Sequence, residues 1–97
     1  MIQRGDGRKV VAAAGTAQAL DTSQEITEII VTAETDNTGV IVVGSSSVVA
    51  ALATRRGTPL NAGQSVVVAD DNIDQIFIDA TVTGDGVTYQ WMKERNR

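Results

Sequence analysis

The chain of 97 residues contains no cysteine, no histidine and a single proline, and its only aromatic residues are Phe77, Tyr89 and Trp91. Without cysteine, neither a disulfide nor a thiolate zinc site can form. Without histidine, the commonest general base and metal ligand is missing, so a Ser-His-Asp or Cys-His catalytic site cannot be built. We therefore expect a protein that is not an enzyme and that holds no cofactor and no metal.

Charge and hydropathy argue against two further classes of protein. The net charge is −4 and the isoelectric point is near 4.5, whereas nucleic-acid binding needs a basic surface that neutralises phosphates. No apolar run approaches the roughly 20 residues of a membrane-spanning helix. The first residues, Met1 to Arg4, lack the apolar stretch of a secretory signal. We expect a protein made in the cytoplasm, with neither nucleic acid nor membrane as a partner.

Aspartates in the second half of the chain are the main acidic candidates for chemistry. A carboxylate pair could serve glycoside hydrolysis, but a domain of this size has little room for a substrate cleft. The spacing of Asp70, Asn72 and Asp74 is similar to the start of a calcium loop, yet the glycine and glutamate that such a loop requires are absent. We interpret the whole set as solvated turn residues: Asp70, Asp71, Asp74, Asp79 and Asp85.

Short runs rich in Val, Ile and Thr alternate with tight turns of Gly, Asn or Asp between Ile26 and Met92. This spacing predicts an all-β fold, a small antiparallel β-sandwich or jelly-roll-like barrel. The clearest strand is Ile26–Ala33, in which Ile29, Val31 and Ala33 would share one face. The sequence Gly84-Asp85-Gly86 predicts a tight hairpin between the last two strands, because glycine and aspartate tolerate a positive φ.

The predicted organisation is a flexible N-terminal arm, residues 1–8, followed by a single β-sandwich domain, residues 9–97. The arm is polar and has glycines at positions 5 and 7. The nearly continuous apolar run Val40–Val43 predicts a strand covered on both faces, by the second sheet and by a partner subunit. The stretch Val48–Ala53 is compatible with one helical turn or with an edge strand.

Seven residues are candidates for contacts with a capsid or with other subunits. A domain of this size has a thin core, and without disulfides it often gains stability by oligomerising. Three candidates give the N-terminal end of the chain a positive charge, two lie in the apolar run, and two form the internal basic pair of the chain. They are Arg4, Arg8, Lys9, Val40, Val42, Arg55 and Arg56.

The segment Ala33–Gly44, with the sequence AETDNTGVIVVG, resembles small structural proteins of tailed bacteriophages. These proteins often have a strand, an Asn-Thr-Gly turn and a second strand that ends in Val-Gly. A serine-rich loop follows, then a segment such as Gly57–Val66 with a Pro-Leu-x-x-Gly-x-Ser turn, and then one such as Ile76–Tyr89. The pieces occur here in that order and cover roughly the last two-thirds of the chain.

The resemblance implies a capsid decoration (cement) protein or a head fibre, with a β-sandwich that is often jelly-roll-like and often trimeric. It implies a location on the capsid surface of the virion, synthesis in the host cytoplasm, and two partners, the major capsid protein and the chain itself as a homotrimer. It carries over no catalytic residue. The alternatives are a neck or tail connector, a fibre-base component, or a carbohydrate-binding adhesion module that stacks sugars on Trp91 and Tyr89.

Overall fold

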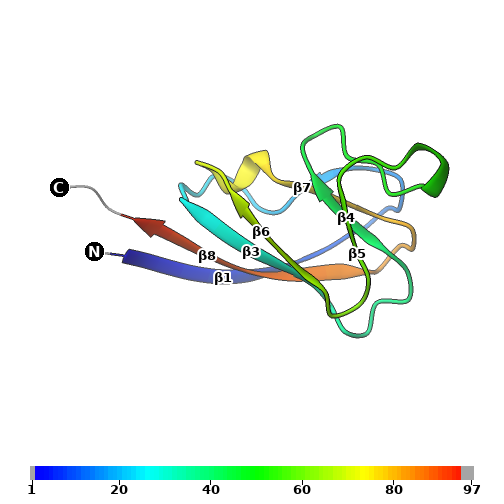
Figure 1. Cartoon of the computed structure of the whole chain (residues 1–97), viewed down its shortest axis with the longest axis horizontal. Helices are drawn as coiled ribbons and strands as arrows, with labels where there is room; N and C mark the ends of the chain where they lie inside the picture. Colours follow the sequence, from blue (N-terminus) through cyan, green and yellow to red (C-terminus); the bar gives the residue numbers. More distant parts are fainter. Residues whose placement is uncertain (1, 95–97) are drawn as a thin grey trace.

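The structure, a computed structural model that describes residues 2–94, consists of two antiparallel four-stranded β-sheets packed face to face (Figure 1). Sheet A has the strand order β1-β8-β3-β6, and sheet B has the order β2-β7-β4-β5. Sheet A contains β1 (Ile2–Val10), β8 (Gly86–Glu94), β3 (Glu28–Ala33) and β6 (Ser65–Ala69). Sheet B contains β2 (Gln18–Ala19), β7 (Phe77–Ala80), β4 (Ile41–Gly44) and β5 (Thr58–Leu60). The predicted all-β sandwich is confirmed.

The core lies between the two sheets and is built from aliphatic side chains. On β3, alternate residues are buried, Ile29, Val31 and Ala33, as the period of two predicts. Facing them from β4 are Ile41 and Val43. Buried side chains from the other strands and from the connecting segments complete the cluster: Val11, Leu20, Ile26, Leu60, Ile73, Ile76, Ile78, Ala80, Val87 and Tyr89.

The outer face of sheet B is covered by the chain's own loop rather than by a second subunit. Val42, on the face of β4 that points away from sheet A, is 0% exposed. It packs with Val48 and Ala50 from the loop that follows β4. That loop contains the 3₁₀ turn η1 (Leu52–Thr54), which shares two residues with the stretch Val48–Ala53, and an isolated β-bridge between Val49 and Arg56. The expectation that a partner subunit covers this strand is unnecessary, because the monomer already buries both of its faces.

Residues 2–8 do not form a flexible arm. They belong to strand β1, which pairs with β8 in an uninterrupted register from Ile2 opposite Glu94 to Val10 opposite Gly86. The sandwich therefore includes the residues that the sequence assigned to an arm, and the predicted boundary at residue 9 falls inside a strand. Met1 lies outside the described residues.

The two glycines that indicated flexibility have a packing role in β1. Gly5 lies opposite Trp91, and Gly7 lies opposite Tyr89. A Cβ atom at either glycine would collide with the ring opposite it. The missing side chains let two large aromatic rings lie over the edge strand, which is how aromatic residues compensate for glycine in a sheet.

The predicted hairpin between the last two strands is also wrong, because β7 and β8 lie in different sheets. Residues 81–85 carry the chain from sheet B to sheet A, and Gly84 takes the positive φ, +97°. The segment that leads from β3 to β4 also crosses between the sheets, and side-chain hydrogen bonds join it to Asp85 and Gly86. The Asn37 amide donates to the Gly86 carbonyl and accepts from the Gly86 N–H, both at 2.9 Å. The Asp85 carboxylate accepts from the N–H groups of Thr38 (3.1 Å) and Gly39 (2.8 Å).

Candidate contact surface

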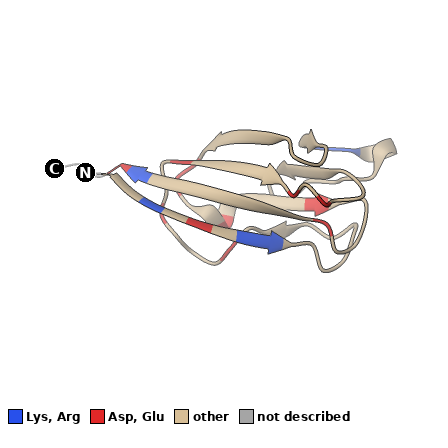
Figure 2. Cartoon of the chain, turned by 90° about the horizontal axis from the view of Figure 1, so that it is seen from below, with Lys and Arg blue, Asp and Glu red and all other residues tan. Residues whose placement is uncertain are grey.

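Strand β1 carries three of the seven candidate contact residues, and the structure separates them by face. Lys9 lies opposite Val87, a buried core residue, so Lys9 projects toward the inner side of sheet A. Arg4, Asp6 and Arg8 project from the outer face, and all three are exposed. Figure 2 shows basic and acidic segments alternating along this strand. The outer row of β1 thus has the charge order plus, minus, plus.

Of the three basic residues on β1, Arg8 is paired within the chain, and Lys9 lies near a carboxylate. The Arg8 guanidinium donates to both carboxylate oxygens of Glu34, and the Nη2–Oε1 distance is 3.1 Å. This two-point contact matches the fork of the guanidinium to the carboxylate. The Lys9 charge lies near enough to Asp21 to help stabilise its carboxylate. Among the described residues, Arg4 forms no ion pair, so its charge is open to a partner.

Tyr89 is tied to the segment that leads from β2 to β3. Its hydroxyl donates to Asp21 Oδ2 at 2.9 Å. Burial of the phenol, and then this hydrogen bond, raise the pKa of Tyr89 to about 12. The N–H of Thr22, and next the Tyr89 hydroxyl, lower the pKa of Asp21. Because Tyr89 is 6% exposed and its ring covers Gly7, it offers no free face for stacking a sugar.

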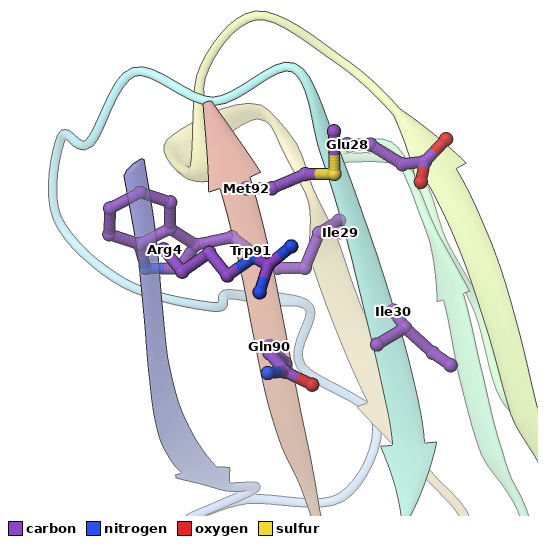
Figure 3. Close-up of a pocket in the computed structure, with 7 residues that line it drawn as sticks. All are labelled: Arg4, Glu28, Ile29, Ile30, Gln90, Trp91 and Met92. Atoms are coloured by element: carbon purple, nitrogen blue, oxygen red, sulfur yellow. The ribbon is translucent and has the colours of Figure 1, made fainter. Parts of the chain in front are cut away.

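A hollow of about 200 Å³ lies at the end of sheet A where β1 begins (Figure 3). The indole of Trp91 reaches across from β8 to β1 there, over Gly5. The hollow is smaller than the roughly 300–1,000 Å³ typical of small-molecule sites, so its size suits a side chain of a partner better than a substrate. Its lining mixes one base, one acid and apolar groups: Arg4, Glu28, Ile29, Ile30, Gln90, Trp91 and Met92.

The loop between β4 and β5 holds the internal basic pair at the other end of the molecule (Figure 1). The Arg55 Nε donates to the Ala50 carbonyl at 3.0 Å, so Arg55 closes the loop on itself. Val49 and Arg56 exchange two main-chain hydrogen bonds, of 3.1 and 2.9 Å. Leu52 is left 80% exposed on η1. The loop thus has a fixed backbone, and it carries both an exposed apolar side chain, Leu52, and the exposed Arg56.

The two apolar candidates of the run before this loop are less accessible than the sequence indicates. Val42 is enclosed by the loop and cannot touch another subunit in this fold. Val40 is half-buried against the same small cluster. Neither forms an open apolar face, because the loop that follows the strand folds back over it.

A buried carboxylate that the sequence interpretation missed holds this loop in place. Asp79, on the outer face of β7 beside Val42, is 1% exposed. Its Oδ2 accepts from the Ala50 N–H at 2.9 Å, and its Oδ1 accepts from the N–H of Gly15, also at 2.9 Å. One side chain therefore ties two separate loops to sheet B. The sequence feature that could have revealed its burial is the position of Asp79 inside the apolar run Ile76–Ala80, because a solvated turn residue does not interrupt a buried strand.

The acidic turn before β7 is held together by the side chain of Asn72. Asn72 Oδ1 accepts from the N–H groups of Gln24 and Asp74, both at 3.1 Å, and so caps the 3₁₀ turn η2 (Ile73–Gln75). Within residues 2–94, no three acidic side chains converge in a way that could hold a metal ion. No helix in that range is long and apolar enough to cross a membrane.

Comparison with known proteins adds no relative to this description. No protein-family model matches the sequence. Searches of curated proteins and of solved structures return no significant match either.

Proposed function

We propose that the chain is a structural protein of a tailed-phage virion, which decorates the capsid surface and clamps neighbouring major capsid subunits as a homotrimer. The proposal is supported by the resemblance of residues 33–89 to small virion proteins. It is also supported by a body 46 Å long that presents exposed contact residues at two separate ends. The observation that carries it is Leu52, which is 80% exposed on a loop whose backbone is fixed by hydrogen bonds.

Leu52 has the physical properties of an attachment residue. The Ala50 N–H donates to the Asp79 carboxylate and the Arg55 guanidinium donates to the Ala50 carbonyl, and these two hydrogen bonds hold the loop. A loop that is already ordered loses little conformational entropy on binding. Burying a leucine side chain contributes about 1.5–3 kcal/mol, and three linked copies would combine such contacts through avidity. The same loop on a mobile backbone would bind more weakly.

Quantitative mass spectrometry of purified virions tests the location. In virions of the phage that encodes the chain, a decoration protein is present in hundreds of copies, whereas a neck component is present in about a dozen, as its ring symmetry requires. We expect hundreds. Absence of the protein from purified virions would contradict the proposal, and about a dozen copies would favour the neck connector instead.

Binding to particles that lack the protein tests the attachment residue. Purified protein is added to virions from a phage with the gene deleted, and the bound fraction is measured after sedimentation. We expect Leu52→Ser to reduce the affinity for particles at least about tenfold, which corresponds to the burial of one leucine. Val67→Ser is the matched control, since Val67 is also an exposed aliphatic residue (57%) but lies on the outer face of sheet A. Equal binding of both variants would exclude the loop as the attachment site.

A further inference from the structure

Strand β1 is a long sheet edge with one open side. It forms one end of sheet A and has a strand partner on one side only, β8. Both edges of sheet B are protected in ways that proteins commonly use, because β2 has two residues and β5 is a three-residue strand that contains Pro59. In contrast, β1 has nine residues, no proline and an unbroken register. Such an edge is suited to accept another strand.

The hydrogen bonds of sheet A show which residues of β1 face the open edge. The carbonyls of Met92 and Gly86 accept from the N–H groups of Thr27 and Glu34, so even-numbered residues of β8 point to the β3 side. Odd-numbered residues of β8 therefore form hydrogen bonds with the odd-numbered residues of β1 that lie opposite them. The main-chain groups of the even-numbered residues of β1 point to the open edge, and these residues include Arg4, Asp6 and Arg8.

The charges on these residues are complementary to a second copy of the same strand in some registers and not in others. If two β1 strands pair antiparallel around Asp6, then Arg4 meets Arg8 and Asp6 meets Asp6, so like charges oppose each other. If they pair around Gly5, Arg4 of each copy lies opposite Asp6 of the other. If they pair around Gly7, Asp6 of each copy lies opposite Arg8. Opposite charges directly across an antiparallel pair are stabilising and like charges are destabilising.

We infer that two copies of this chain associate edge to edge through β1, antiparallel and centred on Gly5, to form one continuous eight-stranded sheet. The Gly5 register is selected over the Gly7 register because Arg8 is already bound at two points by Glu34. Arg4 and Asp6 form no ion pair within residues 2–94, so each can pair with the other copy. The contact is self-complementary, as a two-fold interface requires.

Two further features favour pairing of the two strands around Gly5. The molecule is narrow where β1 begins, next to the end of β8 (Figure 1), so overlap of residues 2–8 keeps the bodies of the two copies apart. The half-buried indole of Trp91 lies over Gly5, so the two-fold axis brings the indoles of both copies together on the inner side of the sheet. Tryptophan and arginine are the residue types most enriched in the energetic centres of interfaces.

Charge exchange across the interface tests the association. Sedimentation equilibrium measures whether the mass at least doubles, whether the starting species is a single chain or the proposed trimer with its three β1 edges, so the result does not depend on the virion proposal. We expect Arg4→Asp to raise the dissociation constant at least about tenfold, because it places two aspartates opposite each other at both symmetric positions. The double variant Arg4→Asp with Asp6→Arg reverses both charges and should restore association. Failure of the double variant to recover affinity, or no doubling of mass in the unchanged protein, would overturn the inference.

Disulfide trapping tests the register, and the natural chain contributes no cysteine of its own. Hydrogen-bonded pairs of an antiparallel sheet have Cα atoms about 5.5 Å apart, within the range that a disulfide spans. A mixture of Arg4→Cys and Asp6→Cys proteins should form a cross-linked dimer under mild oxidation. Asp6→Cys mixed with Arg8→Cys reports the register around Gly7, and Asp6→Cys alone reports the register around Asp6. Cross-linking that is no stronger in the first mixture than in the other two would refute pairing around Gly5.

Discussion

Replacement of Asp79 by alanine should destabilise the sandwich strongly, although aspartate is an ordinary surface residue by composition. Its carboxylate joins β7 to the segment before β2, through the N–H of Gly15, and to the loop after β4, through the N–H of Ala50. It also accepts from the N–H of Ala80. The alanine variant removes all three acceptor contacts at once, and nothing else in the surroundings replaces them.

The magnitude follows from how buried each donor is. Ala50 is 0% exposed, so its N–H would lose its partner without gaining water, which costs about 1–3 kcal/mol. Gly15 is exposed, and the loss of its hydrogen bond costs about 0.5–1.5 kcal/mol. The removed side chain also leaves space beside Val42. Together these terms give about 3 kcal/mol, which lowers the melting temperature of a domain of this size by about 12–24 °C.

Urea unfolding followed by the fluorescence of Trp91 measures this loss. Asp71→Ala is the matched control, because Asp71 is exposed and its carboxylate makes no hydrogen bond to the described residues. The control should change the free energy of unfolding by less than about 0.5 kcal/mol. Hydrogen exchange adds a local readout, since the amide of Ala50 should lose its protection in the Asp79 variant. Equal stability of the two variants would refute the view that Asp79 holds the loops in place.

Two other predictions concern the tyrosine and one glycine. The pKa of Tyr89 is raised to about 12 against about 10 in an unfolded chain, so its stabilising contribution is complete below pH 10 and is lost as the pH rises through 12. The free energy of unfolding should therefore fall more steeply across that range in the natural protein than in Tyr89→Phe, and parallel slopes would contradict the assignment. Gly57 has φ +115°, and a Cβ there would lie 2.7 Å from Val42 Cγ1. Gly57→Ala should thus cost about 1–3 kcal/mol in a thermal melt, more than Gly15→Ala, whose Cβ would meet nothing.

The sequence predicts those features of the fold that depend on a local pattern. The alternation in β3 identifies its buried residues, because a period of two is a property of the strand itself. The sheet to which a strand belongs is not local. Gly84-Asp85-Gly86 has the residues of a hairpin turn, yet the flanking strands bond to different neighbours, and their choice depends on strands far away in the sequence.

The roles of β1 and of the buried Asp79 could not be predicted for the same reason. Glycines at positions 5 and 7 indicate a flexible segment until the aromatic residues opposite them, at the far end of the sequence, are known. Asp79 has the composition of a turn residue, and its partners are main-chain groups of loops, which no residue pattern reveals. Of the predicted contact residues, Arg4 and Arg8 do share an exposed face, whereas Val42 is enclosed by a loop whose path the sequence does not specify.

The position of β8 inside sheet A has a consequence for how the protein is made. Although β8 follows every other strand in the chain, it lies between β1 and β3. A nascent chain that ends before Gly86 therefore lacks the strand that pairs with both β1 and β3. Pairing of β1 with β8 closes a loop that contains most of the chain, which is slow compared with pairing of strands that are close in the sequence. The charged edge of β1 consequently forms only on chains that have been synthesised through β8, so association of two copies through this edge would exclude truncated chains.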